Sequence, residues 1–279
     1  MNLLIQSTHP IQTETLNHLV GLSRAERTVQ ISNSAYRLID AQPHPEIDAY
    51  CLEQRIDYGF VPQGRSLCDF GLLVMDMDST LISIECIDEI ADMQGLKPQV
   101  AAITESAMRG EIDFAESLRR RVALLEGLDE HALQRVYDER LKLNPGAEAM
   151  LAKMKEYGIR TMLVSGGFLF FTERLKPRLG LDYTHANSLE VVGGKLTGKV
   201  LGKVFDAQGK ADWLLRIRDE LKLGPEQVIA MGDGANDLKM MAQAGVSIAY
   251  HAKPVVRVQA SYALNFVGLD GLVNLLGEN

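Results

Sequence analysis

Continuous apolar runs mark the larger part of the chain, from residue 71 to residue 279. Four of them are typical of strands that are buried on both faces of a parallel sheet: LLVMD (72–76), RTMLVS (160–165), QVIAMGD (227–233) and VSIAY (246–250). Helical patterns at 146–157, 168–179, 210–221 and 237–244 separate or follow these runs. Strands that alternate with helices predict an α/β fold with a doubly wound parallel sheet.

Residues 1–66 carry a different pattern, made of short alternating segments. Strands are predicted at 3–6, 27–32, 35–40 and 58–61, with the second and third joined as a hairpin across Asn33 and Ser34. Helices are predicted at 11–22 and 45–56. The resulting order, βαββαβ, predicts a small α+β domain of the ferredoxin-like or ACT-like type, followed by a linker at 62–67.

Two insertions interrupt the α/β pattern. Residues 85–140 contain about four amphipathic helical segments and no strand, which predicts a helical insertion where an ordinary connection would be short. Residues 182–202 are predicted to form a hairpin that turns at Gly193 and Gly194. The stretch GGKLTGKV (193–200) has the spacing of a phosphate-binding P-loop, but Val200 stands where that motif needs Ser or Thr.

Composition excludes several classes of protein. The formal net charge of −8 argues against nucleic acid as a partner, because binding to a phosphate backbone needs a basic surface. No apolar run approaches the ~18–20 residues of a membrane span, and MNLLIQSTHP lacks the features of a secretory signal. The three cysteines, Cys51, Cys68 and Cys86, form no C-x-x-C pair, which favours a reduced, cytoplasmic chain.

Polar and glycine residues follow three of the predicted strands. In an open α/β sheet, ligands bind outside the carboxyl ends of the strands, so these residues should meet at one edge. Carboxylates that meet there would repel one another unless a hard cation with oxygen ligands, such as Mg²⁺, lies between them. Each motif alone is compatible with an ordinary turn, but their joint occurrence favours a metal and phosphate site formed by Asp76, Asp78, Ser165, Gly166, Gly167, Asp233, Asn236 and Asp237.

DMDST (76–80), VSGGF (164–168), Lys210 and GDGANDLKMM (232–241) resemble the four signatures of the haloacid dehalogenase-like phosphatases. The resemblance covers roughly 71–279. With Glu85 and Arg121 in a helical cap, the fuller pattern is similar to members that hydrolyse O-phosphoserine in the last step of serine synthesis. ACT-like domains also precede the catalytic domain in some members of this family.

The resemblance implies a two-step reaction. Asp76 would be the nucleophile that forms an aspartyl-phosphate, and Asp78 would be the general acid and then the general base. Asp76, the backbone carbonyl of Asp78, and Asp233 would hold Mg²⁺.

The resemblance also implies the groups that bind the phosphate. Lys210, Ser165 and the Gly166 N–H would contact the phosphoryl oxygens. Asp237 would orient Lys210 or a water, and Asn236 would touch the substrate.

The cap supplies candidates for recognition of the rest of the substrate. Arg121 lies on the apolar stripe of the predicted helix around 114–125, where it is paired internally, faces a ligand, or extends its charged end to water. The resemblance favours a role in which Arg121 binds the substrate carboxylate, and it assigns Glu85 to the substrate ammonium. Phe114 and Met108 are expected to be apolar contacts from the cap.

Two alternatives stay open. The first is a capped phosphatase of the same family that acts on another small phosphorylated amine. The second is a phospho-aspartate signalling receiver, against which the helical insertion and the spacing of Asp76 and Asp78 argue. A homodimer, and amino-acid binding by residues 1–66, are also left open.

Overall fold

The computed structural model describes residues 1–277, apart from the side chain of Met108, and these residues form two compact units. The first unit contains residues 1–73, 145–160 and those from 218 onward. The second contains residues 74–144 and 161–217. The division falls within β5 (Leu72–Asp76), β6 (Arg160–Phe168) and α9 (Ala207–Glu220).

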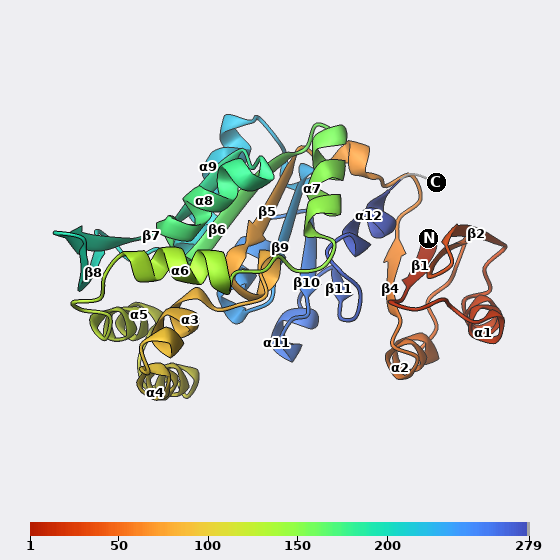
Figure 1. The fold of residues 1–279 in the computed structure, drawn as a ribbon. Helices are drawn as coiled ribbons and strands as arrows, with labels where there is room; N and C mark the ends of the chain where they lie inside the picture. The colour runs from red at the N-terminus through yellow and green to blue at the C-terminus, as the bar shows by residue number, and fades with distance from the viewer. Residues whose placement is uncertain (278–279) are drawn as a thin grey trace. The chain divides into compact units, whose positions relative to one another are not determined.

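The first unit begins with the predicted βαββαβ segment (Figure 1). Its four strands pair antiparallel in the order β2-β3-β1-β4, which confirms the ferredoxin-like arrangement. The elements are β1 (Asn2–Gln6), α1 (Thr13–Ser23), β2 (Arg27–Ser32), β3 (Ala35–Ile39), α2 (Glu46–Glu53) and β4 (Asp57–Val61).

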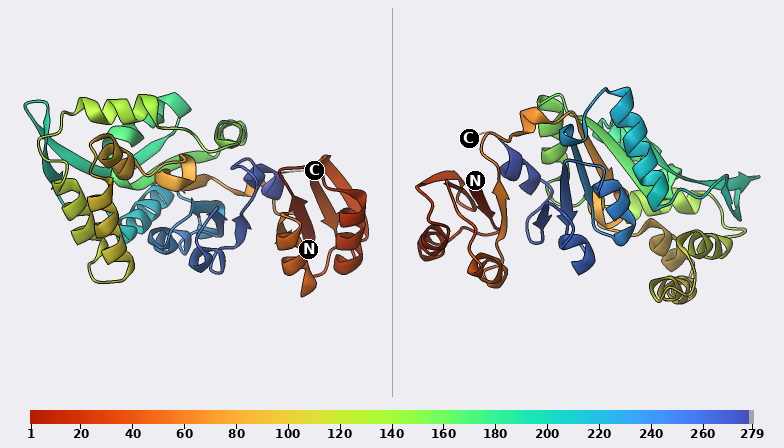
Figure 2. Two further views of the ribbon diagram at one scale, coloured as in Figure 1. Left: turned by 60° about the horizontal axis from the view of Figure 1, so that its bottom comes forward. Right: turned by 180° about the vertical axis from the view of Figure 1, so that it is seen from behind.

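The two faces of this sheet have different surroundings. Because side chains alternate along a strand, Leu3 and Ile5 of β1 share one face. They pack with Leu19 of α1 and with Ile47 and Cys51 of α2, so both helices cover that face (Figure 2). The other face bonds to residues 265–277 of the same unit through polar side chains that are buried.

The rest of the first unit contains a parallel part of the α/β fold. Strands β9, β10 and β11 pair parallel to one another. β9 and β10 are buried at every position, as their continuous apolar sequences predicted. The elements are a 3₁₀ turn at Leu67–Asp69, α7 (Ala147–Glu156), a 3₁₀ turn at Pro225–Gln227, β9 (Val228–Gly232), a 3₁₀ turn at Ala235–Asp237, α10 (Leu238–Met241), β10 (Val246–Tyr250), α11 (Pro254–Arg257), β11 (Tyr262–Leu264) and α12 (Gly271–Leu276).

The second unit contains the helical insertion and the predicted hairpin. A π-turn, Met77–Leu81, follows β5, and the insertion forms four helices, as the sequence predicted: α3 (Cys86–Met93), α4 (Lys97–Met108), α5 (Phe114–Ala123) and α6 (His131–Glu139). β6 is followed by α8 (Leu169–Leu179), and β6 pairs parallel with β7 (Tyr183–Val192).

β7 and β8 (Lys195–Leu201) pair antiparallel around Gly193 and Gly194, so this segment is the expected hairpin rather than a P-loop. No helix within residues 1–277 is long and apolar enough to cross a membrane.

Candidate functional site

Asp76, the last residue of β5, forms a buried ion pair with Lys210 of α9. The Lys210 Nζ atom lies 2.7 Å from Asp76 Oδ1, and the two side chains are 1% and 6% exposed. The same carboxylate oxygen accepts the backbone N–H of Met77 at 2.7 Å. A charge that is removed from water needs such partners, so the pair explains how the strand can end in a buried aspartate.

Asp78, two residues further on, is held by hydrogen bonds from two other elements. Its Oδ1 accepts the Cys86 N–H at 2.9 Å, and its Oδ2 accepts the Ser165 hydroxyl at 3.0 Å. Burial raises the pKa of the Asp78 carboxyl, while the bonds from Cys86 and Ser165 and the charge of Lys210 oppose that rise. A carboxyl group that keeps its proton more readily than usual can act as a general acid.

The chain reverses sharply between Asp78 and the first helix of the insertion. Ser79 has a φ of 57°, in the left-handed region, and its N–H donates to the Ile84 carbonyl at 3.2 Å. The Ser79 hydroxyl donates to Glu85 Oε1 at 2.8 Å. The turn therefore brings Glu85 back to the segment that carries the two aspartates, and Ser79 has a contact that the sequence did not reveal.

The segment Ser165-Gly166-Gly167, near the end of β6, has no room for a side chain at either glycine. A Cβ atom on Gly166 would lie 2.9 Å from Phe114 Cζ, and one on Gly167 would lie 2.8 Å from Asp78 Oδ2. The Ser165 Oγ atom also accepts the Gly167 N–H at 2.8 Å. Phe114 lies over this turn, as expected of a cap contact, whereas the side chain of Met108 is outside the described part of the structure.

Arg121 of α5 is half-buried among acidic side chains. Burial lowers the pKa of its guanidinium, and the charges of Asp88, Glu85 and Asp78 raise it. Its Nε atom donates to the Ser117 carbonyl at 3.4 Å. The structure thus places Arg121 in the electrostatic neighbourhood of Glu85 and Asp78, within the second unit.

In the first unit, β9 leads into a loop that carries the remaining candidates. Asp237 is fully buried, and its Oδ2 accepts the Gly234 N–H at 3.1 Å. The Asp233 carbonyl accepts the Lys253 N–H at 3.0 Å. The Asn236 side chain folds over Gly234, because a Cβ there would lie 2.2 Å from Asn236 Oδ1. The loop therefore has a fixed shape, with the side chains of Asp233 and Asn236 half-buried.

A buried residue that the sequence analysis did not single out is Asn187 of β7. Its side chain bonds to the backbone of Gly166 and Phe205, and it is 3% exposed. Asn is uncommon within strands, so an asparagine inside a predicted strand is the signal that could have identified it.

Two family models match the chain. Residues 73–242 match the model of the family described as haloacid dehalogenase-like hydrolase, and residues 3–47 match a domain of unknown function, DUF4072. The chain is 54% identical over 215 residues to a phosphoserine phosphatase of a Polaromonas species. The aligned region covers 75% of this chain and 91% of the relative.

Solved structures are similar over almost the whole chain. The unliganded crystal structure of a probable phosphoserine phosphatase from Vibrio cholerae has a TM-score of 0.87 and 38% identity, covering 99% of this chain and 86% of that one. A HAD family hydrolase from Salmonella enterica serovar Typhi has a TM-score of 0.89 and 34% identity, covering 100% and 99%.

Proposed function

We propose that this chain, which belongs to the haloacid dehalogenase-like hydrolase family, hydrolyses O-phospho-L-serine to L-serine and phosphate. Family membership confirms the resemblance that the four motifs predicted. The observation that carries the proposal is the buried Asp76–Lys210 pair beside Asp78 and Ser165 in one unit, in a chain whose relatives are phosphoserine phosphatases.

Asp76 and Asp78 divide the reaction into two steps. An Asp76 oxygen attacks phosphorus and forms an aspartyl-phosphate, while Asp78 gives its proton to the departing serine oxygen. Asp78 then takes a proton from water, which attacks phosphorus and releases phosphate and the free Asp76 carboxylate. The raised pKa of Asp78 and its position two residues after Asp76 support this division of roles.

Lys210 and the turn at Ser165 are proposed to bind the phosphoryl oxygens. Lys210 is held on the Asp76 carboxylate, where the phosphoryl group would be transferred. Ser165 and the Gly166 N–H lie near the end of β6, and α8 begins at Leu169, three residues after Gly166. Positive charge and N–H groups that are already in place stabilise the charge of the transition state without reorganisation.

A magnesium ion is proposed to be held by the carboxylates of Asp76 and Asp233 and by the backbone carbonyl of Asp78. Asp237 is proposed to orient Lys210 or a water molecule. The donor set fits, because Asp76, Asp233 and Asp237 are carboxylates that could hold a metal ion and Mg²⁺ prefers oxygen ligands. When bound, the ion reduces the repulsion between an anionic nucleophile and an anionic phosphate.

Arg121 and Glu85 are proposed to select the amino-acid part of the substrate. The planar guanidinium of Arg121 suits a carboxylate, and Glu85 suits an ammonium. Asn236 is proposed as a further substrate contact. The position of Arg121 near Glu85 and Asp78, whose charges act on its guanidinium, supports a role close to the proposed reacting groups.

The test is phosphate release from O-phospho-L-serine and, in separate assays, from phosphothreonine, phosphoethanolamine and a sugar phosphate, each with and without Mg²⁺. We expect selective, Mg²⁺-dependent release that Asp76→Asn abolishes. Arg121→Lys should raise the KM for phosphoserine by ~10-fold or more and leave that for phosphoethanolamine, which has no carboxylate, nearly unchanged. Turnover of the other compounds but not of phosphoserine would reject the substrate. Stable phosphorylation without turnover would favour a signalling receiver.

Several further expectations stay predictions. They are the place in serine synthesis, the cytoplasmic location, a homodimer, the boundary of a separate domain at residue 66 with the cap at about 85–140, and amino-acid binding by residues 1–66. Serine binding to the full chain, measured by calorimetry with the phosphate site saturated by inorganic phosphate, would test the last of these.

A further inference from the structure

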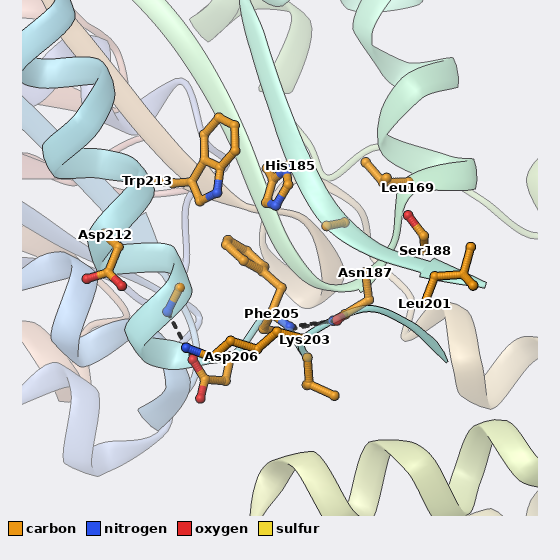
Figure 3. A pocket seen from close by; sticks show the side chains of 13 residues that line it. Leu169, His185, Asn187, Ser188, Leu201, Lys203, Phe205, Asp206, Asp212 and Trp213 are labelled. Carbon is orange, nitrogen blue, oxygen red and sulfur yellow. Dashed lines mark hydrogen bonds between the residues drawn. The ribbon is translucent and has the colours of Figure 1, made fainter. Parts of the chain in front are cut away.

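Asn187 joins two backbone segments that lead to different groups of the proposed phosphate site. Its Nδ2 donates to the Gly166 carbonyl at 2.9 Å and to the Phe205 carbonyl at 3.1 Å. Its Oδ1 accepts the Phe205 N–H at 2.7 Å. Figure 3 shows the side chain directed at the Phe205 nitrogen. All three hydrogen bonds of the Asn187 side chain are made to main-chain groups. Asn187 therefore fixes the position of the backbone and not that of another side chain.

The Gly166 end of this connection leads directly to the anion-binding turn. Gly166 follows Ser165, whose hydroxyl bonds to Asp78 at 3.0 Å. Position 166 has no side chain of its own to anchor it, and Phe114 occupies the space where a Cβ would stand. The hydrogen bond from Asn187 is therefore a specific constraint on the orientation of the peptide at Gly166.

The Phe205 end leads to Lys210. Asp206, the next residue, accepts the Lys210 N–H through its backbone carbonyl at 3.0 Å and the Gly209 N–H through Oδ1 at 2.9 Å. These bonds fix the first turn of α9, from which Lys210 reaches Asp76. The position of the Lys210 ammonium thus depends on where the backbone of residues 205 and 206 is held.

The surroundings of Asn187 make its hydrogen bonds strong constraints. It is 3% exposed and lines the wall of a cavity of about 360 Å³. On the same wall, the His185 ring stacks on Trp213 at 4.0 Å and meets the Phe205 ring edge-on at 4.7 Å (Figure 3). Replacing the Asn187 amide would remove the partners of three main-chain groups, of which the Phe205 N–H and carbonyl make bonds that are buried.

We propose that Asn187 is a positioning residue that sets the distance between the Ser165–Gly166 turn and Lys210. This inference rests on the proposed function, since it assumes that both groups contact the phosphoryl oxygens. Asn187 itself does not touch the substrate. Its effect should appear in the transition state, because charge grows on the phosphoryl oxygens there, whereas the cap residues hold the amino-acid part in both states.

The expected result is a split between kcat and KM. A misplacement of about 1 Å can cost ~10²-fold in rate, so Asn187→Asp and Asn187→Leu should each lower kcat on the order of 10- to 100-fold. KM for O-phospho-L-serine should change less than ~3-fold. Asn187→Asp keeps the acceptor for the Phe205 N–H and removes both donated bonds. Asn187→Leu removes all three.

The matched control is Thr161→Val, at the opposite end of the same pair of strands. The Thr161 hydroxyl donates to Asp182 Oδ2 at 3.2 Å, and the residue is 5% exposed. It is thus another buried polar side chain that joins β6 to the residue before β7, and it lies at the other end of β6 from Ser165. Thr161→Val should lower the stability to urea in a similar way and keep the kcat of the wild-type protein.

A second measurement does not depend on turnover. With Mg²⁺ present, the affinity for beryllium fluoride, which mimics a phosphoryl group on a carboxylate, is measured by ¹⁹F NMR. We expect Asn187→Asp to bind it on the order of 10-fold more weakly than the wild-type protein or Thr161→Val.

The outcomes separate the two proposals. Wild-type kcat and beryllium fluoride affinity in folded Asn187→Asp would overturn the role of Asn187. An equal loss of kcat in Thr161→Val would also overturn it, because general destabilisation would then explain both. If the wild-type protein hydrolyses p-nitrophenyl phosphate but not phosphoserine, the substrate is wrong while Asn187 is still judged on the first compound. A wild-type protein that neither hydrolyses a phosphomonoester nor binds beryllium fluoride would overturn both proposals.

Discussion

In the Asp76–Lys210 pair, the proposed reaction needs both charges. Each of these charges would be costly to bury without the other. Removing one partner leaves an uncompensated buried charge, which typically costs about 3–5 kcal/mol. We therefore expect Lys210→Met and Asp76→Asn each to lower the free energy of unfolding by that order, and to abolish phosphate release. The double variant should be destabilised by clearly less than the sum, because it contains neither charge.

Urea unfolding of the four proteins in a double-mutant cycle measures this coupling. An exposed pair provides the control: Lys153 lies 2.7 Å from Glu156, and the two side chains are 45% and 61% exposed. Lys153→Met should change stability by less than about 1 kcal/mol. Additive losses at Asp76 and Lys210 would mean that the pair does not stabilise the fold.

At the same scale, His185 should give the protein a dependence on pH in the acidic range. Burial lowers the pKa of His185 below its ordinary 6.5, and the charge of Arg216 lowers it further. Because the folded protein disfavours the protonated ring, the contribution of His185 to stability is present above about pH 6.5 and is lost as the pH falls through the folded pKa. His185→Phe, which keeps a ring beside Trp213, should lose less stability than the wild-type protein between pH 7 and pH 5.

Urea midpoints at the two pH values check this prediction. An identical loss in both proteins would show that other groups cause the acid sensitivity. The same ring also illustrates a limit of the sequence: a histidine in a strand pattern does not show that it will stack on Trp213, which lies 28 positions away along the chain.

At the scale of elements, the sequence predicted most of the fold because periodicity is a local property. β5 and β10 have the predicted ends, and the four cap helices and the β7–β8 hairpin were expected. β11 and α12 were not, since three and six residues are too few for a reliable period. The contacts Ser79–Glu85 and Asn187–Phe205 depend on backbone geometry between elements, which no local pattern contains.

Two glycines should respond to alanine with opposite signs, because their backbones differ. Gly194, in the β7–β8 turn, has a φ of 78°, which alanine adopts only with strain. Gly21 lies in α1 with open space around its Cβ position and no positive φ. We expect Gly194→Ala to destabilise by about 1 kcal/mol or more and Gly21→Ala to stabilise by about 0.4–1 kcal/mol.

Thermal and urea unfolding of both variants measure these shifts. Since neither glycine lies in the proposed site, phosphate release per folded molecule should stay at the wild-type level in both. A stabilised Gly194→Ala would show that the hairpin turn relaxes to another type.

At the scale of the molecule, the first unit joins residues from the two ends of the chain through buried polar bonds. The Asp57 carboxylate accepts the N–H groups of Asn265, Phe266 and Val267 at 2.7, 2.9 and 3.0 Å. Arg37 donates to two backbone carbonyls near the C-terminal end of α12, both at 2.9 Å. The N-terminal sheet is therefore part of the packing of this unit, in addition to any ligand it binds.

The sheet also packs closely against apolar side chains from the same C-terminal segment. A Cβ on Gly59 would lie 2.7 Å from the Tyr262 ring and 2.8 Å from Leu275. Residues 262–277 would thus lose both hydrogen bonds and apolar cover if the N-terminal strands were absent. Apolar surface exposed in this way favours association between molecules.

We therefore expect a protein of residues 67–279 to unfold at lower urea concentration than the full chain and to associate at micromolar concentration.

A point variant separates the contribution of the polar bonds from the loss of apolar contacts. Asp57→Ala leaves three N–H groups without their acceptor and should lower the free energy of unfolding by about 3 kcal/mol or more. Asp48→Ala is the control, because Asp48 is exposed on α2 and accepts only the Tyr58 hydroxyl, at 3.2 Å, among the bonds described. It should cost less than about 1 kcal/mol. A shortened chain as stable and monomeric as the full protein would show that residues 1–66 are an independent attachment. In that case a role in binding, rather than in folding, would be the reason for their presence.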